Sequence, residues 1–137
     1  MPHADTPAPI RRRPRGRRRW RAPRIPARSI TGEHMDALHD FLLRRTAYLL
    51  EAHPPGTEEH RMADTLHRAI DQTWAELQDC YDFYHRGDAD MEIELAGTWN
   101  SLRMFGISWM RAPDYDERLW PPAAYENLLI TSLPTEH

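Results

Sequence analysis

The fold is decided by residues 53–86, HPPGTEEHRMADTLHRAIDQTWAELQDCYDFYHR. The Pro-Pro-Gly run interrupts any preceding helix, and Thr57 follows as an N-cap with two glutamates in the next turn, where they favour the positive end of the helix dipole. Residues then recur at seven-residue spacing in two interleaved rows, flanked by Trp74 and Tyr81: Ala63, Ile70, Leu77, Tyr84 and Leu66, Thr73, Cys80. This lattice predicts one long helix that runs to about Arg86, with Gly87 as its C-cap.

A helix is also predicted upstream of this stretch, from Met35 to Ala52. Its apolar positions recur at intervals of three and four and form one face, on which Arg45 is the single charged residue: Leu38, Phe41, Leu42, Tyr48, Leu49, Ala52. Because only residues 53–56 separate the two patterns, the helices should fold back on each other as an antiparallel hairpin.

A third helix is predicted after a cap at Asp88 or Asp90, and Pro113 should stop it. Its main stripe is Met91, Leu95, Trp99, Leu102, Phe105, Gly106 and Trp109. Four further apolar residues lie off that stripe: Ile93, Met104, Ile107 and Met110. The C-terminal half of this helix should therefore be more buried than the other helices, or should meet a protein partner or a second copy of the chain.

The expected fold class is all-α, an antiparallel three-helix bundle over residues 35–111 followed by a C-terminal loop, short helix and tail over 112–137. The short helix should begin at Pro122 and run to Ile130. We expect Trp120 to clamp the tail onto the bundle rather than bind a ligand, and the other tryptophans of the helical stripes, at 74, 99 and 109, to be core residues.

Charge divides the chain into two parts. The 18 basic residues are all Arg; ten of them fall in residues 1–34 against two acids, about +8, whereas residues 35–137 carry eight Arg against nineteen acids, about −11. Six of the twelve Pro also lie in 1–34, and the few large apolar residues there follow no period. Such a segment cannot bury enough surface to offset its ordering entropy, so we expect residues 1–34 to be a disordered basic arm.

Three interpretations of this arm stand side by side. It could bind phosphate backbones without sequence preference, with the aromatic ring stacking on a base, through Arg11, Arg12, Arg13, Arg15, Arg17, Arg18, Arg19, Trp20 and Arg21. It could instead lie on the acidic surface of its own domain. Finally, the codons of Thr31–His34 permit a ribosome-binding site before Met35, which would then be the natural start of the protein.

Catalytic, cofactor and metal sites are not predicted. Three Asp-x-x-His spacings occur on the predicted helices, Asp36/His39, Asp64/His67 and Asp82/His85, but helix geometry keeps the three pairs apart. The lone Cys80 falls at a core position and is expected to be an inert small hydrophobe. The six Gly are scattered singly and form no phosphate loop.

Composition indicates the expected cellular location and the type of genome. One cysteine excludes a disulfide framework, no apolar run is long enough for a membrane span, and the N-terminus lacks the apolar core of a secretory signal, so a cytoplasmic location is expected. The absence of Lys beside abundant Arg, Ala and Pro is typical of a GC-rich genome.

A short C-terminal pattern resembles a family of small actinobacterial helical proteins of unknown function. It comprises Ser101-Leu102-Arg103-Met104-Phe105, then Ala112-Pro113-Asp114-Tyr115-Asp116-Glu117-Arg118-Leu119-Trp120-Pro121, and a Met-Asp start at Met35-Asp36. The family usually has His where Ala112 stands and a Cys-rich middle that this chain lacks. The resemblance implies no activity, but it favours Met35 as the start.

Taken together, these patterns favour a non-enzymatic helical interaction or adaptor protein. The second hypothesis is a nucleic-acid-binding accessory protein that uses the Arg-rich arm. The third is a metal-dependent helical-bundle enzyme built on the Asp-x-x-His pairs.

Overall fold

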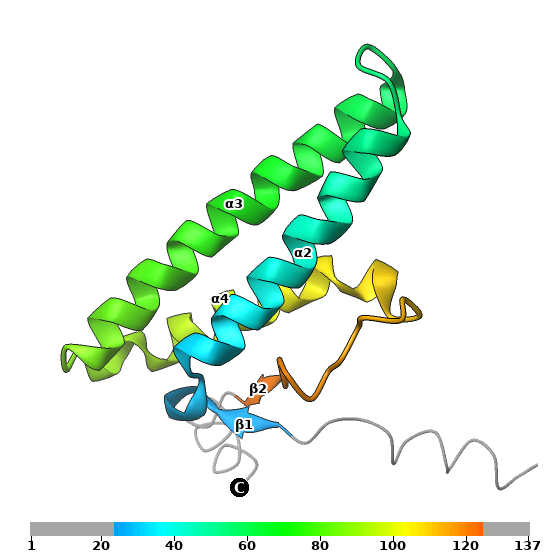
Figure 1. Cartoon of the computed structure of the whole chain (residues 1–137). Helices are drawn as coiled ribbons and strands as arrows, with labels where there is room; N and C mark the ends of the chain where they lie inside the picture. Colours follow the sequence, from blue (N-terminus) through cyan, green and yellow to red (C-terminus); the bar gives the residue numbers. More distant parts are fainter. Residues whose placement is uncertain (1–23, 125–137) are drawn as a thin grey trace, which may run out of the picture.

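The computed structural model describes residues 24–124 and is predominantly helical, as expected for the all-α class (Figure 1). Three α-helices carry the fold, with short 3-10 segments and a two-residue strand at each end of the described chain. In order the elements are β1 (Ile25–Pro26), η2 (Ala27–Ser29), α2 (Gly32–Ala52), α3 (Glu58–His85), η3 (Ala89–Met91), α4 (Glu92–Phe105), η4 (Ile107–Trp109) and β2 (Ala123–Ala124).

Helices α2 and α3 form the long hairpin that the sequence predicts. The Thr57 hydroxyl accepts a hydrogen bond from the His60 amide at 3.1 Å and caps α3. Gly56 and Gly87 have φ of +95° and +111°, so the turns before and after α3 use the left-handed conformation that glycine adopts without a steric cost. The predicted bounds of the second helix are confirmed to within a residue.

Helix α4 is shorter than predicted and crosses the hairpin instead of running along it. The main stripe is packed as expected, with Leu95, Trp99 and Leu102 fully buried. The helix ends at Phe105, and η4 replaces the rest of the predicted helix before Pro113. Figure 1 shows α4 lying across the lower half of the α2–α3 pair.

The sequence predicts a disordered arm up to residue 34 and a folded body from Met35, but residues 24–34 are part of the fold. Ala27 and Ile30 are 0% and 1% exposed, and η2 packs against α4. Helix α2 begins at Gly32, because the Thr31 hydroxyl accepts from the His34 amide and His34 Nδ1 accepts from the Thr31 amide, both at 3.1 Å. Two small apolar contacts and one capping box thus order a segment whose Arg and Pro content suggested disorder.

Strand β1 pairs in parallel with β2, although the sequence predicts no strand. The pairing joins the two ends of the described chain, and Ile25 donates its amide to the Pro122 carbonyl at 2.9 Å. The helix predicted from Pro122 is wrong at its start, since Ala123–Ala124 is extended. Its remainder lies outside the described residues.

The loop after η4 is held by α4, as the tail-clamp prediction requires. Trp99 Nε1 donates to the Pro121 carbonyl at 2.7 Å, and Arg103 donates to the Trp120 carbonyl at 2.8 Å. The amide of Asn100 makes two 3.0 Å bonds to the backbone of Ala123. Trp120 itself is 2% exposed, so its predicted burial against the bundle is confirmed.

The aromatic rings of this clamp meet on α2. The Phe41 ring centroid lies 5.0 Å from that of Trp120 and 5.6 Å from that of Tyr115. Residues of the quoted C-terminal pattern, including Leu102, Arg103, Tyr115 and Trp120, therefore act together as one packing unit. No helix among residues 24–124 has the length and apolarity to cross a membrane.

Candidate interaction surface

The groove between α2 and α3 is filled by α4 along only part of its length. Gly106, at the end of α4, lies so close to α2 that a Cβ there would be 3.6 Å from the side chains of Leu42 and Phe41. On the other wall, Cys80 Sγ of α3 is 3.9 Å from Thr98 Oγ1 of α4. These contacts define the covered end of the groove.

Beyond α4 the same groove continues without a cover. Leu49 is one heptad past Leu42, and Leu66 is two heptads before Cys80, so both lie on the faces that α4 contacts lower down. They border a cavity of about 430 Å³ lined by Leu49, His53, Glu59, Met62, Ala63 and Leu66. We call these six residues the open groove.

A second hollow adjoins the open groove across α3. Its volume is about 460 Å³, and it shares Met62 and Leu66 with the open groove. Met62 is 64% exposed and Tyr48, one heptad past Phe41, is 54% exposed. We call the end of the hairpin at the α2–α3 turn its free end. This free end therefore presents apolar side chains to solvent on the side from which α4 packs.

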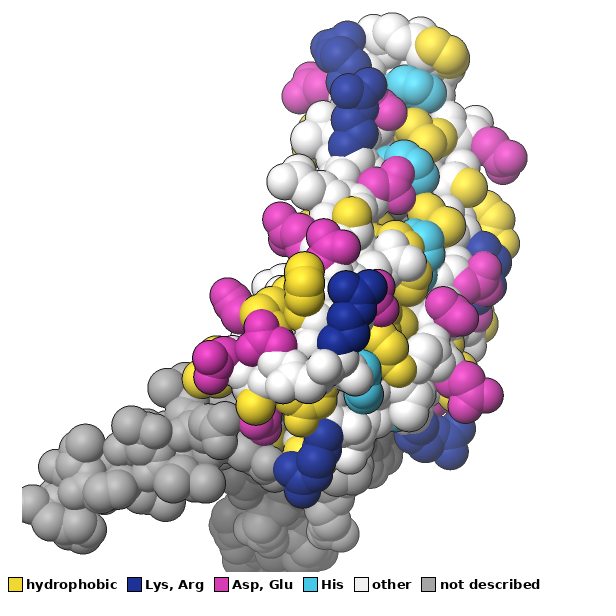
Figure 2. All heavy atoms as spheres, turned by 90° about the vertical axis from the view of Figure 1, so that its left-hand side faces the viewer, with side chains coloured by type: hydrophobic (Ala, Val, Ile, Leu, Met, Phe, Trp, Pro, Cys, Tyr) yellow, Lys and Arg dark blue, Asp and Glu magenta, His cyan; other side chains and the backbone are white. Residues whose placement is uncertain are grey.

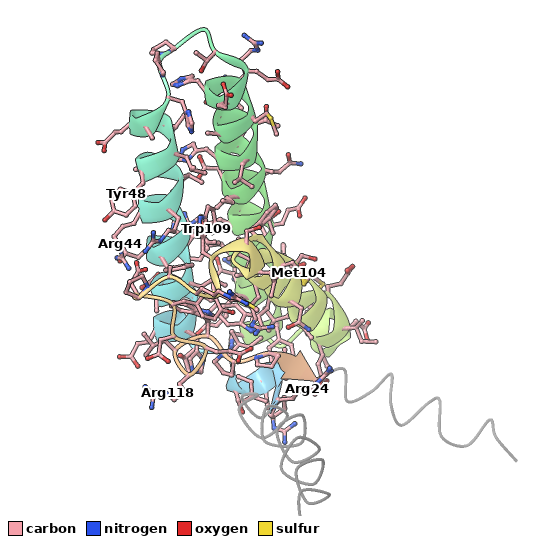
Figure 3. The ribbon with its side chains drawn as sticks, turned by 90° about the vertical axis from the view of Figure 1, so that its right-hand side faces the viewer. Arg24, Arg44, Tyr48, Met104, Trp109 and Arg118 are labelled. Carbon is pink, nitrogen blue, oxygen red and sulfur yellow. The ribbon has the colours of Figure 1, made fainter. Side chains whose placement is uncertain are left out.

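The second apolar surface is the α4 ridge, defined as Ile93, Met104, Ile107 and Met110. These are the residues that the sequence analysis placed off the main stripe, and all four are between 40% and 64% exposed. Figure 3 shows Met104, near the end of α4, and Trp109, in η4, below Tyr48 on the hairpin. The C-terminal part of the ridge thus adjoins the covered end of the groove.

An ion-pair cluster on α2 holds the C-terminal loop beside the covered end of the groove. Arg45, the one charged residue predicted on the apolar face of α2, pairs with Asp114, and Arg44 reaches the same carboxylate at 3.4 Å. The hydrogen bond from Arg45 lowers the pKa of Asp114. The Arg45 guanidinium also lies 5.7 Å from the Phe41 ring centroid and 5.3 Å from that of Tyr48. Arg45 thus ties the loop to α2 where the core ends.

The opposite side of the hairpin is closed by histidines rather than by a helix. Three layers at heptad spacing bring residues of α2 and its C-cap against residues of α3. His39 stacks on Trp74 at 4.0 Å between ring centroids, Thr46 Oγ1 is 3.2 Å from His67 Nδ1, and His60 Nδ1 is 2.9 Å from the His53 carbonyl. Figure 2 shows histidine side chains in a row along this side.

Burial is the main influence on the pKa of His39 in this row. It lowers the pKa of His39, against the opposing effect of Asp71, Asp36 and Asp40, whereas nearby His67 acts in the same direction as burial. His39 Nε2 is buried without a hydrogen-bond partner. His39 is therefore held in its neutral form, with the Trp74 ring as its main contact.

The Asp and His of an Asp-x-x-His pair contact other residues and not each other. Asp64 pairs with Arg68 at 3.1 Å, while His67 lies 3.4 Å from Asp71. The ring of His85 packs against that of Tyr81, with centroids 4.2 Å apart. Among residues 24–124, no three His, Cys, Asp or Glu side chains come together in a way that could hold a metal ion.

Cys80 is half-buried and free, and burial raises the pKa of its thiol. A raised pKa keeps the sulfur in the unreactive thiol form. Of the tryptophans predicted to be core residues, Trp99 is fully buried, while Trp74 and Trp109 are half-buried and pack against the core.

The residues predicted to bind nucleic acid, Arg11, Arg12, Arg13, Arg15, Arg17, Arg18, Arg19, Trp20 and Arg21, lie outside the described residues. That hypothesis stays a prediction. Comparison with protein-family models, with curated proteins and with solved structures gives no match in any of the three.

The open groove is the feature that sequence reasoning missed. Met62 lies outside both heptad rows, so its role at the surface carried no periodic signal. Helix length gave no signal either, because the third helix is predicted to run to Pro113, whereas α4 has only 14 residues against 21 and 28 in α2 and α3. At 1.5 Å per residue, a helix of that length cannot cover the whole hairpin.

Proposed function

We propose that this protein is a non-enzymatic helical interaction protein that receives an amphipathic helix in the open groove. The observation that carries the proposal is the continuity of that groove with the one that α4 fills. The hairpin accepts a third helix across its lower half, and the same faces of α2 and α3 continue past the end of α4.

The energetics of a two-helix arm support this function. A helix pair can bury only the sides that face each other, and the remaining apolar sides need another element. Here Met62 and Tyr48 remain more than half exposed at the free end. Burying each apolar side chain under a docked helix would contribute about 1 to 2 kcal/mol, given about 25 cal/mol per Å² of apolar area.

The recognition chemistry would be the insertion of apolar anchors from one face of the incoming helix. Anchors at positions i, i+3 or i+4 and i+7 match a groove that runs along two helices. Glu59 lines the groove at the first turn of α3, and Glu58 lines the adjoining hollow. A basic residue beside the anchors of the incoming helix would complement these carboxylates.

A displayed library of amphipathic helices, selected against the full chain, tests the proposal. Selected helices should share the anchor spacing, bind at micromolar concentrations and lose at least about tenfold in affinity against Met62→Glu. Phe83→Glu is the matched control, because Phe83 is also about half exposed but lies near the opposite end of α3. Failure to enrich any helix, or equal binding to parent and Met62→Glu, would contradict the proposal.

A further inference from the structure

We infer that the occupant of the open groove is a second copy of this chain, and that two hairpin ends pair antiparallel about a twofold axis. This inference rests on the proposed function of the groove and names its partner. In the pair, the free end of each hairpin lies against the C-terminal end of the partner's α4 ridge, and the hairpins together form a four-helix bundle.

The apolar surfaces have the layout that such a twofold pair requires. An isologous interface is self-complementary, so a patch at one end must fit a patch at the other end of the same face. The open groove with Met62 lies at the free end of the hairpin. The ridge residue Met104 lies near the covered end, and Ile107 and Met110 follow it in and just after η4, next to Gly106, which packs on α2. Antiparallel pairing sets each groove against the partner's ridge, with both copies in equivalent positions.

Charge beside the two apolar surfaces is complementary locally. Glu59 lines the open groove and Glu58 the adjoining hollow, at the free end of the hairpin. Arg111 directly follows Met110 of the α4 ridge and is exposed. Antiparallel pairing brings Glu59 of one copy toward Arg111 of the other.

The exposed apolar side chains supply about two thirds of the area that each partner of a specific dimer buries. Tyr48, Met62, Met104, Ile107 and Met110 are each 40% to 64% exposed. At about 200 Å² for a fully exposed large side chain, they supply about 550 Å². The half-buried groove residues raise this toward the roughly 800 Å² per partner of a standard interface. Since the apolar anchors are few, the dimer should dissociate in the micromolar range.

Sedimentation velocity on the full chain, from about 1 to about 200 µM, measures the association directly. The parent should convert from monomer to dimer across this range. Met62→Glu should weaken the dimer at least about tenfold, and Phe83→Glu should leave it unchanged. Both substitutions fall at exposed positions, and circular dichroism verifies that each variant is folded.

A charge exchange tests the antiparallel arrangement. Glu59→Arg and Arg111→Glu should each weaken self-association about threefold to tenfold, because like charges then meet at both ends of the interface. An equimolar mixture of the two variants should recover the parent affinity as a heterodimer, since both contacts regain opposite charges. Absence of recovery in the mixture would overturn the antiparallel arrangement.

The remaining outcomes separate this inference from the proposed function. A parent that stays monomeric at about 200 µM overturns the second-copy assignment. If displayed helices still bind that monomer through Met62, the proposed function stands and the natural occupant is another helix. A dimer that appears only when residues 125–137 are deleted would identify that segment as the occupant and would also overturn this inference.

Discussion

Replacing Ile30 with Ala tests whether the segment before α2 belongs to the folded domain. Ile30 is 1% exposed in a core that also contains Ala27, and η2 beside it packs against α4. Truncating a buried Ile to Ala costs about 2 to 5 kcal/mol, depending on how far the cavity collapses. Because this segment lies at the edge of the domain and can partly relax, we expect about 2 to 3 kcal/mol.

Urea unfolding followed by circular dichroism at helical wavelengths measures this loss. At constant slope, the midpoint should shift in proportion to the free energy, and a thermal melt should fall by about 10 to 20 °C for a domain of about 100 residues. Ile93→Ala is the matched control, since Ile93 is 43% exposed on α4 and Ala favours helix. Its cost should stay below about 1 kcal/mol.

The reasoning is refuted if Ile30→Ala and Ile93→Ala shift the midpoint equally. In that case Ile30 would not be part of the core, and a chain starting at Met35 would fold as well as one starting at residue 24. The expected result is the opposite: starting at Met35 should lower stability, because it removes Ile30 and the Thr31 cap, which alone contributes about 1 kcal/mol.

Three further measurements examine the clamp, the histidine row and the basic arm. Trp120→Ala should cost about 3 kcal/mol in urea unfolding, whereas Leu119→Ala, at a half-exposed position, should cost under about 1, and equal midpoints would contradict the clamp. Because the folded pKa of His39 lies below 6.5, the free energy of unfolding should be highest above pH 6.5 and should fall as the pH drops through the folded pKa. His39→Phe keeps a ring on Trp74 and should flatten this fall, whereas an unchanged pH profile would contradict the role of burial. The affinity of the full chain for nucleic acid should fall by several orders of magnitude between about 50 and 200 mM salt. Deletion of residues 1–23 should abolish binding, and binding by the shortened chain would refute a site on the arm.

The sequence by itself determined the helical class and the hairpin. Heptad spacing in α3, the Thr57 cap and the Pro-Pro-Gly break are local signals, and each acts within a few residues. The same locality revealed the buried stripe of α4 and the off-stripe residues that form its exposed ridge. It also indicated that Trp120 packs on the body, because a Trp among prolines sits in a stiff segment.

Only the tertiary structure decided how far α4 reaches and what remains uncovered. The open groove exists because α4 crosses the hairpin and stops at Phe105, and no periodicity within α2 or α3 encodes where another helix ends. Ile30 and β1 show that distant contacts can also order a segment that local signals do not predict to be folded. Their order depends on α4 and on strand β2, and the paired residues Ile25 and Ala123 are 98 positions apart along the chain. A contact over that separation leaves no local pattern, so composition alone suggested disorder where packing supplies structure.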